Sequence, residues 1–221
     1  MSPAPAGPFR PAGDWSMIGE LPAASAIVLA GGRSTRFGRD KLVEPYAGRP
    51  LVHHAVVALA GVSTEVVVAI GPVGDGPDLP SDREAGVPVR VVRDPMPGGG
   101  PLVGLLAGLE RVRESSVIVA GGDMPSLAPE VLRALLRALG ATTDADAIAL
   151  VRRGRREPLP VALRTGAATD VARRLLADGE RRLGAVLDAL RTHDIPEGAW
   201  RPLDPEALSL RDVDVPGDLV T

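Results

Sequence analysis

The stretch that decides the fold reads Ala26-Ile27-Val28-Leu29-Ala30-Gly31-Gly32-Arg33-Ser34-Thr35-Arg36-Phe37-Gly38-Arg39-Asp40-Lys41. Its apolar first residues predict a strand buried on both faces of a parallel sheet, and the glycine pair predicts a tight turn after it. Because glycine tolerates positive φ and has no side chain, Gly31 and Gly32 let backbone N–H groups approach an anion closely. Arg36 and Lys41 add positive charge near that turn. We expect the loop to hold a nucleoside triphosphate.

The spacing of the glycines separates this loop from two better-known phosphate-binding loops. A P-loop has four residues between its glycines and ends in Gly-Lys-Ser/Thr. Here five residues separate Gly32 from Gly38, and Leu42 follows Lys41. The dinucleotide-binding spacing Gly-x-Gly-x-x-Gly is absent from the loop as well. The sequence therefore predicts a phosphate-binding turn of another class, and the structural alternative is a plain glycine turn followed by solvated arginines.

Composition excludes several classes of protein. Of 221 residues, 45% are hydrophobic but only 2% are aromatic, so we expect an aliphatic core and no platform for stacking nucleic-acid bases. The formal net charge of −3 argues against a polyanionic partner. The sequence has no cysteine, which excludes disulfides and thiolate chemistry. It has no apolar run near the roughly 20 residues of a membrane span and no signal-peptide core, so we expect a cytoplasmic protein without membrane contact.

Strands and helices are expected to alternate along one domain, 23–221, behind a disordered tail, 1–22, that is rich in Pro, Ala and Gly. The expected strands lie at 25–30, 65–70, 87–92, 116–120, 145–151, 159–163 and 209–213. The expected helices cover about 50–60, 102–113, 129–139, 167–177 and 180–191. This alternation predicts a three-layer, Rossmann-like α/β fold, with an open, mostly parallel twisted sheet and helices on both of its faces.

Three loops that follow expected strands carry the unusual residues of the chain, and they cover 31–41, 94–101 and 121–125. In open α/β sheets, ligands bind at the carboxyl ends of the strands. We therefore expect the glycine loop, Asp94 and Asp123 to lie around one site.

The stretch 29–41, which reads LAGGRSTRFGRDK, closely resembles the signature of the molybdenum cofactor guanylyltransferase family, the MobA-like nucleotidyltransferases. Weaker resemblances follow in the family's order, so that the match spans about 25–219. They are Asp94 with Gly100-Pro101-Leu102, Gly122-Asp123-Met124-Pro125, Glu157-Pro158-Leu159 and Asp212-Val213-Asp214-Val215-Pro216-Gly217-Asp218-Leu219. The chain departs from the family where Val103 replaces an Ala, where Gly122 replaces a Cys, and where Gly71-Pro72 replaces an Asn that touches the nucleotide.

The resemblance implies a role for each residue that matches a family motif. Most of these residues would bind the nucleotide, one of them would also bind Mg²⁺, and one would bind either the metal or the acceptor. In chain order, Leu29, Ala30, Gly31 and Gly32 would contact the nucleotide through the backbone, Lys41 would bind its triphosphate, Asp94 would contact the nucleotide, Asp123 would bind both Mg²⁺ and nucleotide, and Asp214, where the family has Asn, would be a second metal ligand or an acceptor contact.

The activity that the resemblance implies is the Mg²⁺-dependent transfer of GMP from GTP to the phosphate of molybdopterin, with release of pyrophosphate. Because the acceptor phosphate is already ionised at neutral pH, catalysis needs positioning and charge neutralisation rather than a general base. The catalytic residues would be Arg36 and Lys41, which stabilise the leaving pyrophosphate, and Asp123, which holds Mg²⁺. Two alternatives stay open: a cytidylyl- or sugar-phosphate nucleotidyltransferase of the same fold, and a nucleotide-binding module without turnover.

The aspartates of the motifs also have structural interpretations. Asp94 and Asp123 stand close to prolines at strand ends, where an aspartate often caps a turn. Asp214 and Asp218 flank Pro216, and either could cap a helix there.

Two further polar groups have more than one interpretation. The basic turn 152–156 either binds an anionic acceptor or is a solvated hairpin. His53 and His54 lie in an expected helix with no partner in the sequence that suggests a triad or a metal site, so we interpret them as structural residues.

Overall fold

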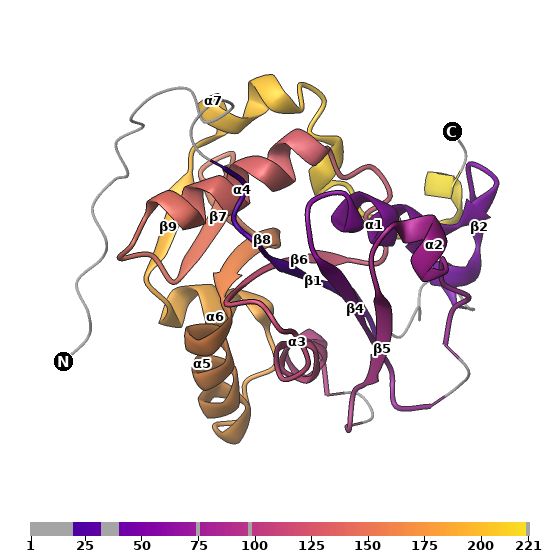
Figure 1. Ribbon diagram of the computed structural model, residues 1–221, viewed down its shortest axis with the longest axis horizontal. Helices are drawn as coiled ribbons and strands as arrows, with labels where there is room; N and C mark the ends of the chain where they lie inside the picture. Colours follow the sequence, from indigo (N-terminus) through magenta and orange to yellow (C-terminus); the bar gives the residue numbers. More distant parts are fainter. Residues whose placement is uncertain (1–19, 32–39, 74–75, 97–98, 220–221) are drawn as a thin grey trace.

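The central feature of the structure, a computed structural model that describes residues 20–31, 40–73, 76–96 and 99–219, is one large sheet (Figure 1). Within these residues seven strands pair in the order β5-β4-β1-β6-β8-β7-β9. Their bounds are β1 Ser25–Ala30, β4 Glu65–Ile70, β5 Val89–Arg93, β6 Ser116–Gly121, β7 Ala147–Arg152, β8 Arg155–Arg164 and β9 Thr192–Ile195. A separate antiparallel hairpin joins β2, Pro45–Tyr46, to β3, Arg49–Pro50.

Strand β1 lies in the parallel part of the sheet, between β4 and β6. It pairs in parallel with both neighbours, and β4 pairs in parallel with β5. The register places Leu29 opposite Ala69 of β4 and opposite Gly121 of β6. The carboxyl ends of these strands therefore reach the same edge of the sheet, as the alternation of strands and helices predicts.

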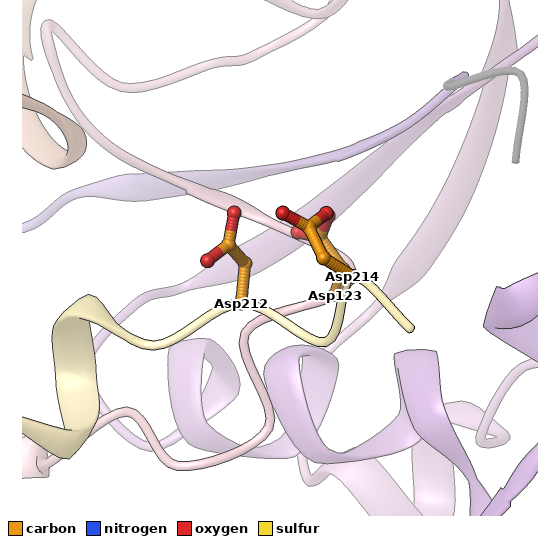
Figure 2. A group of neighbouring side chains, drawn as sticks. All are labelled: Asp123, Asp212 and Asp214. Atoms are coloured by element: carbon orange, nitrogen blue, oxygen red, sulfur yellow. The ribbon is translucent and has the colours of Figure 1, made fainter. Parts of the chain in front are cut away.

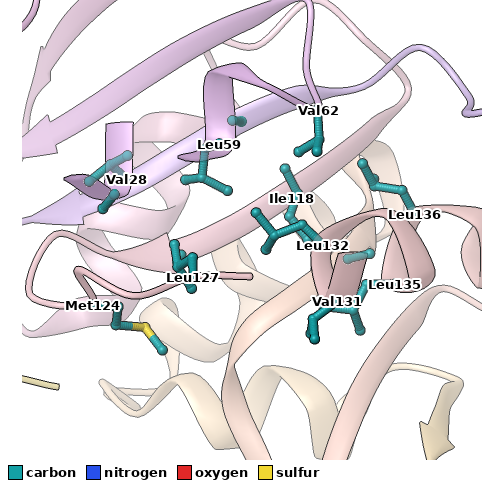
Figure 3. Packing of buried hydrophobic residues seen from close by; sticks show 14 of the residues in the cluster. Val28, Leu59, Val62, Ile118, Met124, Leu127, Val131, Leu132, Leu135 and Leu136 are labelled. Carbon is teal, nitrogen blue, oxygen red and sulfur yellow. The ribbon is translucent and has the colours of Figure 1, made fainter. Parts of the chain in front are cut away.

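Helices cover both faces of this sheet (Figure 1). Helices α1 and α4 pack on one face, where Val28 and Ile118 meet Leu59 and Leu132 in an aliphatic core (Figure 3). On the other face Ile27 belongs to a second core with residues of α3, α5 and α6. The helices are α1 Leu51–Ala60, α2 Asp82–Ala85, α3 Pro101–Leu109, α4 Pro129–Ala141, α5 Thr165–Ala177, α6 Leu183–Ala189 and α7 Glu197–Trp200, and short 3₁₀ turns cover η1 Lys41–Val43, η2 Arg201–Leu203, η3 Leu208–Leu210 and η4 Pro216–Leu219. The prediction of a three-layer, mostly parallel α/β fold is confirmed.

The sheet departs from parallel pairing at β8, which is antiparallel to both β6 and β7. The reason is the tight turn between β7 and β8. Arg153 and Gly154 form a two-residue loop with φ of 51° and 75°, the left-handed pair that matches the twist of a hairpin. The strand expected at 159–163 therefore begins earlier, at Arg155.

The prediction of a strand at 209–213 is wrong, because the first residues of this stretch belong to the 3₁₀ turn η3. The side chain of Asp204 accepts hydrogen bonds from the N–H groups of Leu208, at 3.0 Å, and Ser209, at 2.8 Å. These hydrogen bonds stabilise a tight turn, although the alternating apolar residues of this stretch are typical of a strand. The edge strand beside β7 is β9, which follows α6 in the chain. This strand was not predicted, because its middle residues are polar.

Parts of the predicted organisation lie outside the described residues. These are residues 1–19 of the expected tail, and Gly32 and Arg36 of the glycine-rich loop. Among the residues that are described, every helix is too short or too polar to span a membrane.

Candidate active site

A cavity of about 760 Å³ lies at the carboxyl ends of β1, β4 and β6. It is lined from these strands and from the N-terminal part of α3. Its walls include Leu29, Ala30, Gly31, Gly71, Asp94 and Asp123. The expectation that the first and third loops and Asp94 surround one site agrees with this placement.

Two glycines of α3 let this helix approach the sheet closely beside the cavity. Gly104 of α3 lines the cavity, and a Cβ there would lie 3.8 Å from Leu29 and Ala69 side chains. One turn further along, a Cβ on Gly108 would lie 2.9 Å from Ile27 of β1, so this glycine lets α3 approach the sheet closely. The two helical glycines thus bring the start of α3 down to the end of β1.

Lys41 lines the cavity and is the first residue of η1. The preceding Asp40 caps η1, because its side chain accepts a 3.0 Å hydrogen bond from the N–H of Leu42. The ammonium of Lys41 lies 2.8 Å from Oδ2 of Asp123 and 3.4 Å from Oδ1 of Asp214, and it donates to the carbonyl of Val213 at 2.7 Å. Burial works against its charge, but the hydrogen bond and charge of Asp123, and then Asp214, outweigh burial and raise the pKa of Lys41. The side chain is therefore a fixed positive charge at neutral pH.

Asp123 follows β6 directly, and glycines fix the direction of its carboxylate. The N–H of Gly122 donates to the carbonyl of Leu29 at 2.9 Å, which ties the loop to the end of β1. A Cβ on Gly121 would collide with Oδ1 of Asp123. The carboxylate can take its observed orientation only because residue 121 has no side chain.

Three carboxylates converge at this position (Figure 2). Asp123, Asp212 and Asp214 each offer an oxygen, and these oxygens all lie within 4.8 Å of one another. Desolvation in the cluster raises the pKa of Asp212, and the charges of Asp214 and Asp123 raise it further. All three donors are carboxylate oxygens, the ligand type that Mg²⁺ prefers, and the ammonium of Lys41 already lies beside two of them. The donor set therefore fits a divalent cation.

Asp212 is the one member of this cluster that the sequence analysis did not assign. The signal that points to it is its place in the motif, since the segment 212–219 resembles a family motif in which both 212 and 214 are amide residues. Spacing would have found it as well, because residues 212 and 214 share one side of an extended segment.

Asp94 follows β5, where it forms a turn and also lines the cavity. Its N–H donates to the carbonyl of Ile70 at 2.9 Å, and its Oδ1 accepts a 2.7 Å hydrogen bond from the N–H of Met96. This is the turn expected of an aspartate before proline. The residue also lines the cavity although only 6% of it is exposed, so the turn holds a carboxylate at the cavity wall.

Asp218 acts as a cap at the end of the chain. Its Oδ2 accepts hydrogen bonds from the N–H groups of Asp214 and Val215, each at 3.0 Å. These bonds hold the pKa of Asp218 below its usual range. Asp214, by contrast, points its own carboxylate toward Lys41 and Asp123 (Figure 2).

Carboxylates pair with two of the four arginines of the basic turn 152–156. Arg152 pairs with Glu157 at 2.7 Å, and Arg156 pairs with Asp194 at 2.7 Å. The backbone N–H of Arg153 donates to Glu197 at 2.8 Å. These contacts favour the interpretation of the turn as a solvated, ion-paired hairpin over its interpretation as an anion site.

His53 and His54 contact only backbone in the hydrogen bonds that the structure assigns to them within the described residues. Nε2 of His53 lies 3.0 Å from the carbonyl of Asp78, and Nε2 of His54 lies 2.8 Å from that of Tyr46. These contacts tie α1 to the loop at Asp78 and to the β2–β3 hairpin.

The chain is similar in sequence to enzymes of one family. A family model described as "MobA-like NTP transferase domain" matches residues 26–194. A protein of Chloroflexus aggregans named "Probable molybdenum cofactor guanylyltransferase" is 34% identical over 198 residues, which cover 88% of this chain and 91% of that protein. A protein of the same name from Mycobacterium tuberculosis is 37% identical over 184 residues, covering 81% of this chain and 86% of the relative.

Solved structures share the fold. The molybdopterin-guanine dinucleotide biosynthesis protein A of Archaeoglobus fulgidus superposes with a TM-score of 0.69 at 24% identity, covering 88% of this chain and 94% of the other. The 2-C-methyl-D-erythritol 4-phosphate cytidylyltransferase of Thermus thermophilus superposes with a TM-score of 0.65 at 17% identity, covering 90% and 96%. At these identities the likeness concerns the arrangement of strands and helices.

Proposed function

The chain belongs to the MobA-like NTP transferase family, and we propose that it transfers GMP from GTP to the phosphate of molybdopterin cofactor with the help of Mg²⁺. The observation that carries this proposal is the pair formed by Lys41 and Asp123, 2.8 Å apart beside the cavity. The pair places a cation suited to phosphates next to an anion suited to a metal ion. The names of the relatives support guanine as the base and molybdenum cofactor as the acceptor.

The nucleotide would occupy the cavity along the ends of β1 and β4. Leu29 to Gly31 line it, and Gly31 approaches the backbone of Gly71 so closely that a Cβ would lie 3.4 Å from its nitrogen. Asp94 offers a carboxylate at the cavity wall, which can accept hydrogen bonds from the N–H groups of a guanine or from ribose hydroxyls. Both features favour binding by backbone and by one buried acceptor.

Asp123 would hold the Mg²⁺, with Asp212 and Asp214 as the additional donors at hand. When bound there, the ion would neutralise phosphate oxygens and hold them in place for an in-line displacement. Asp123 is fixed by the Gly122–Leu29 hydrogen bond, so the protein presents this ligand in a preset orientation.

Lys41 would stabilise the triphosphate and the pyrophosphate that leaves. Its charge is secured by a raised pKa, and its contacts hold the ammonium beside the cavity. The oxygen of an acceptor phosphate attacks the α-phosphorus, the bond to the bridging oxygen breaks, and pyrophosphate departs. No proton has to be removed from an ionised phosphate, so the residues around the cavity need only position and neutralise the reacting groups.

The proposal is tested by measuring pyrophosphate release with molybdenum-loaded cofactor, Mg²⁺ and each of GTP, CTP, UTP and ATP in turn. Release with GTP alone is the expected result. Release with CTP in place of GTP would replace the guanylyltransferase by a cytidylyltransferase. Tight binding of GTP without release would indicate a nucleotide-binding module that lacks turnover.

A further inference from the structure

We infer that Val213 is a positioning residue for the reaction, an inference that rests on the proposed function: it holds Lys41 and Asp123 together and directs the two aspartates beside it. Val213 is apolar and touches no reacting atom. Two backbone hydrogen bonds and the packing of its buried side chain support the assignment.

The backbone of Val213 bonds to both members of the candidate catalytic pair. Its carbonyl accepts the 2.7 Å hydrogen bond of the Lys41 ammonium, and its N–H donates to the carbonyl of Asp123 at 2.9 Å. Lys41 comes from the loop after β1 and Asp123 from the loop after β6, so a single residue of the C-terminal segment links the two loops. A shift of Val213 would move both.

The side chain of Val213 is held in an apolar seat. It is 3% exposed and packs with Leu51, the first residue of α1, in a small cluster against which Tyr46 of the β2–β3 hairpin packs. Tyr46 is itself fixed by His54, whose ring lies edge-on at 5.2 Å and whose Nε2 lies 2.8 Å from the Tyr46 carbonyl. The seat is therefore part of the folded core around α1 and does not depend on the cavity.

The same seat explains why the sequence reads Asp-Val-Asp here. In an extended segment, alternate side chains point to opposite sides. Because Val213 points into the seat, Asp212 and Asp214 both point the other way, toward Asp123 (Figure 2). Loss of the seat would release both carboxylates from Asp123 at once.

A chemical feature of the sequence makes the inference testable without activity. Lys41 is the only lysine in the 221-residue chain, and all the other residues in the combined count of Lys and Arg are arginines. An amine-selective acylating reagent therefore reports on Lys41 and the N-terminal amine alone, and mass spectrometry of an arginine-cleaved digest separates the two. The rate of Lys41 acylation measures how firmly its ammonium is held.

The test compares Val213→Ala with Val213→Ile, which retains a branched side chain, and with Val117→Ala. Val117 is fully buried and lies at the opposite end of β6, so it controls for a lost pair of methyl groups in the core. In Val213→Ala we expect Lys41 to be acylated about fivefold faster, the factor that one net hydrogen bond provides. We expect Mn²⁺, used as the metal probe in electron paramagnetic resonance, to bind about tenfold more weakly because its ligands are displaced. Val213→Ile should restore both values, and Val117→Ala should leave both unchanged even where its melting temperature falls.

Kinetics provide the matching readout on the full-length protein. Val213→Ala should lower kcat about tenfold and change the KM for GTP much less, because the backbone of β1 and Asp94 stay in place. If Val213→Ala does not fold, Tyr46→Ser removes the seat from the other side and should accelerate Lys41 acylation in the same direction. Equal behaviour of Val213→Ala and Val117→Ala, or unchanged acylation in a folded Val213 or Tyr46 variant, overturns the inference. A wild-type protein that releases no pyrophosphate but shows the acylation and Mn²⁺ pattern would refute the proposed function and leave the positioning role standing.

Discussion

The ammonium of Lys41 lies 2.8 Å from the carboxylate of Asp123, which joins the ends of two strands that are neighbours in the sheet. Each residue follows its strand by way of glycines, and each is fixed by a backbone contact: Lys41 by the carbonyl of Val213, Asp123 by the Val213 N–H. The pair is therefore preorganised by the fold, which is what electrostatic catalysis of a phosphate transfer requires.

Replacing Asp123 with Asn should remove metal binding and leave the fold intact. The amide keeps the size of the side chain but loses the charge that a hard divalent cation needs. We expect Mn²⁺ affinity, measured by electron paramagnetic resonance, to fall by at least about tenfold. Glu114→Gln is a control outside the site, since the Glu114 carboxylate accepts a 3.0 Å hydrogen bond from Thr64. Undiminished Mn²⁺ affinity in Asp123→Asn would rule out this carboxylate as the principal ligand.

Adding a methyl group at residue 121 should disturb Asp123 through space. In Gly121→Ala the new Cβ would collide with Oδ1 of Asp123, so the carboxylate has to turn away. We expect kcat to fall about tenfold or more, because small displacements of catalytic groups are costly. Gly166→Ala in α5 is the matched control: a Cβ there meets nothing within 4 Å, and the substitution should raise stability by about 0.5–1 kcal/mol. Wild-type kcat in Gly121→Ala would show that the orientation of Asp123 is not set by this glycine.

Asp94→Asn should weaken nucleotide binding more than it slows the reaction. The substitution retains an oxygen that can accept the hydrogen bond from Met96, so the turn is kept while the charge is lost. We expect the KM for GTP to rise about tenfold, the value of one hydrogen bond to a charged group, with a smaller change in kcat. Asp82→Asn is the control, because the exposed Asp82 side chain accepts a hydrogen bond from the N–H of Val89, the first residue of β5. An unchanged KM for GTP in Asp94→Asn would show that this carboxylate serves the turn alone.

Glu65 should make the stability of the protein depend on acid pH. Burial raises the pKa of this carboxyl, but hydrogen bonds from Ser25, from the backbone of Arg113 and from Arg90 outweigh burial and lower the pKa below its ordinary value of 4.5. A carboxyl with a lowered folded-state pKa stabilises the fold above its unfolded pKa, and that contribution is lost as the pH falls through the lower, folded value. Urea unfolding should therefore show stability decreasing below about pH 4.5 in the wild type and less steeply in Glu65→Gln.

At pH 7 the same substitution should cost about 2 kcal/mol, because it leaves the Arg90 guanidinium without its carboxylate and weakens the hydrogen bonds of the buried Ser25 hydroxyl and of the Arg113 N–H. Glu110→Gln is the control, since Glu110 pairs with Arg173 on the surface, where an ion pair contributes little. Equal unfolding free energies for the two variants, or equal acid slopes for Glu65→Gln and the wild type, would contradict this role of Glu65.

The sequence predicts the frame of the site better than its details. The strand patterns of β1, β5 and β6, each followed by glycine or aspartate, are enough to place three loops at one edge, because parallel strands end together. The sequence does not predict that β8 is antiparallel, because this depends on the two-residue turn before it. It does not predict β9 either, because the middle residues of this edge strand are polar. The proposed role of Val213 could not be inferred from pattern alone: it follows from the apolar seat formed by Tyr46 and Leu51, which is a contact between distant parts of the chain.

The most direct test of the central claim is the rate of pyrophosphate release from GTP, with Mg²⁺ and molybdenum-loaded cofactor, by the wild type and by Lys41→Met. Methionine keeps the length of the side chain and removes the only lysine charge of the chain. Loss of one preorganised charge at the phosphates should reduce kcat by at least about a hundredfold. Lys41→Arg should restore little of it, because a planar guanidinium does not fit the place of a compact ammonium between Asp123, Asp214 and the Val213 carbonyl. A Lys41→Met protein that releases pyrophosphate at the wild-type rate would contradict the account.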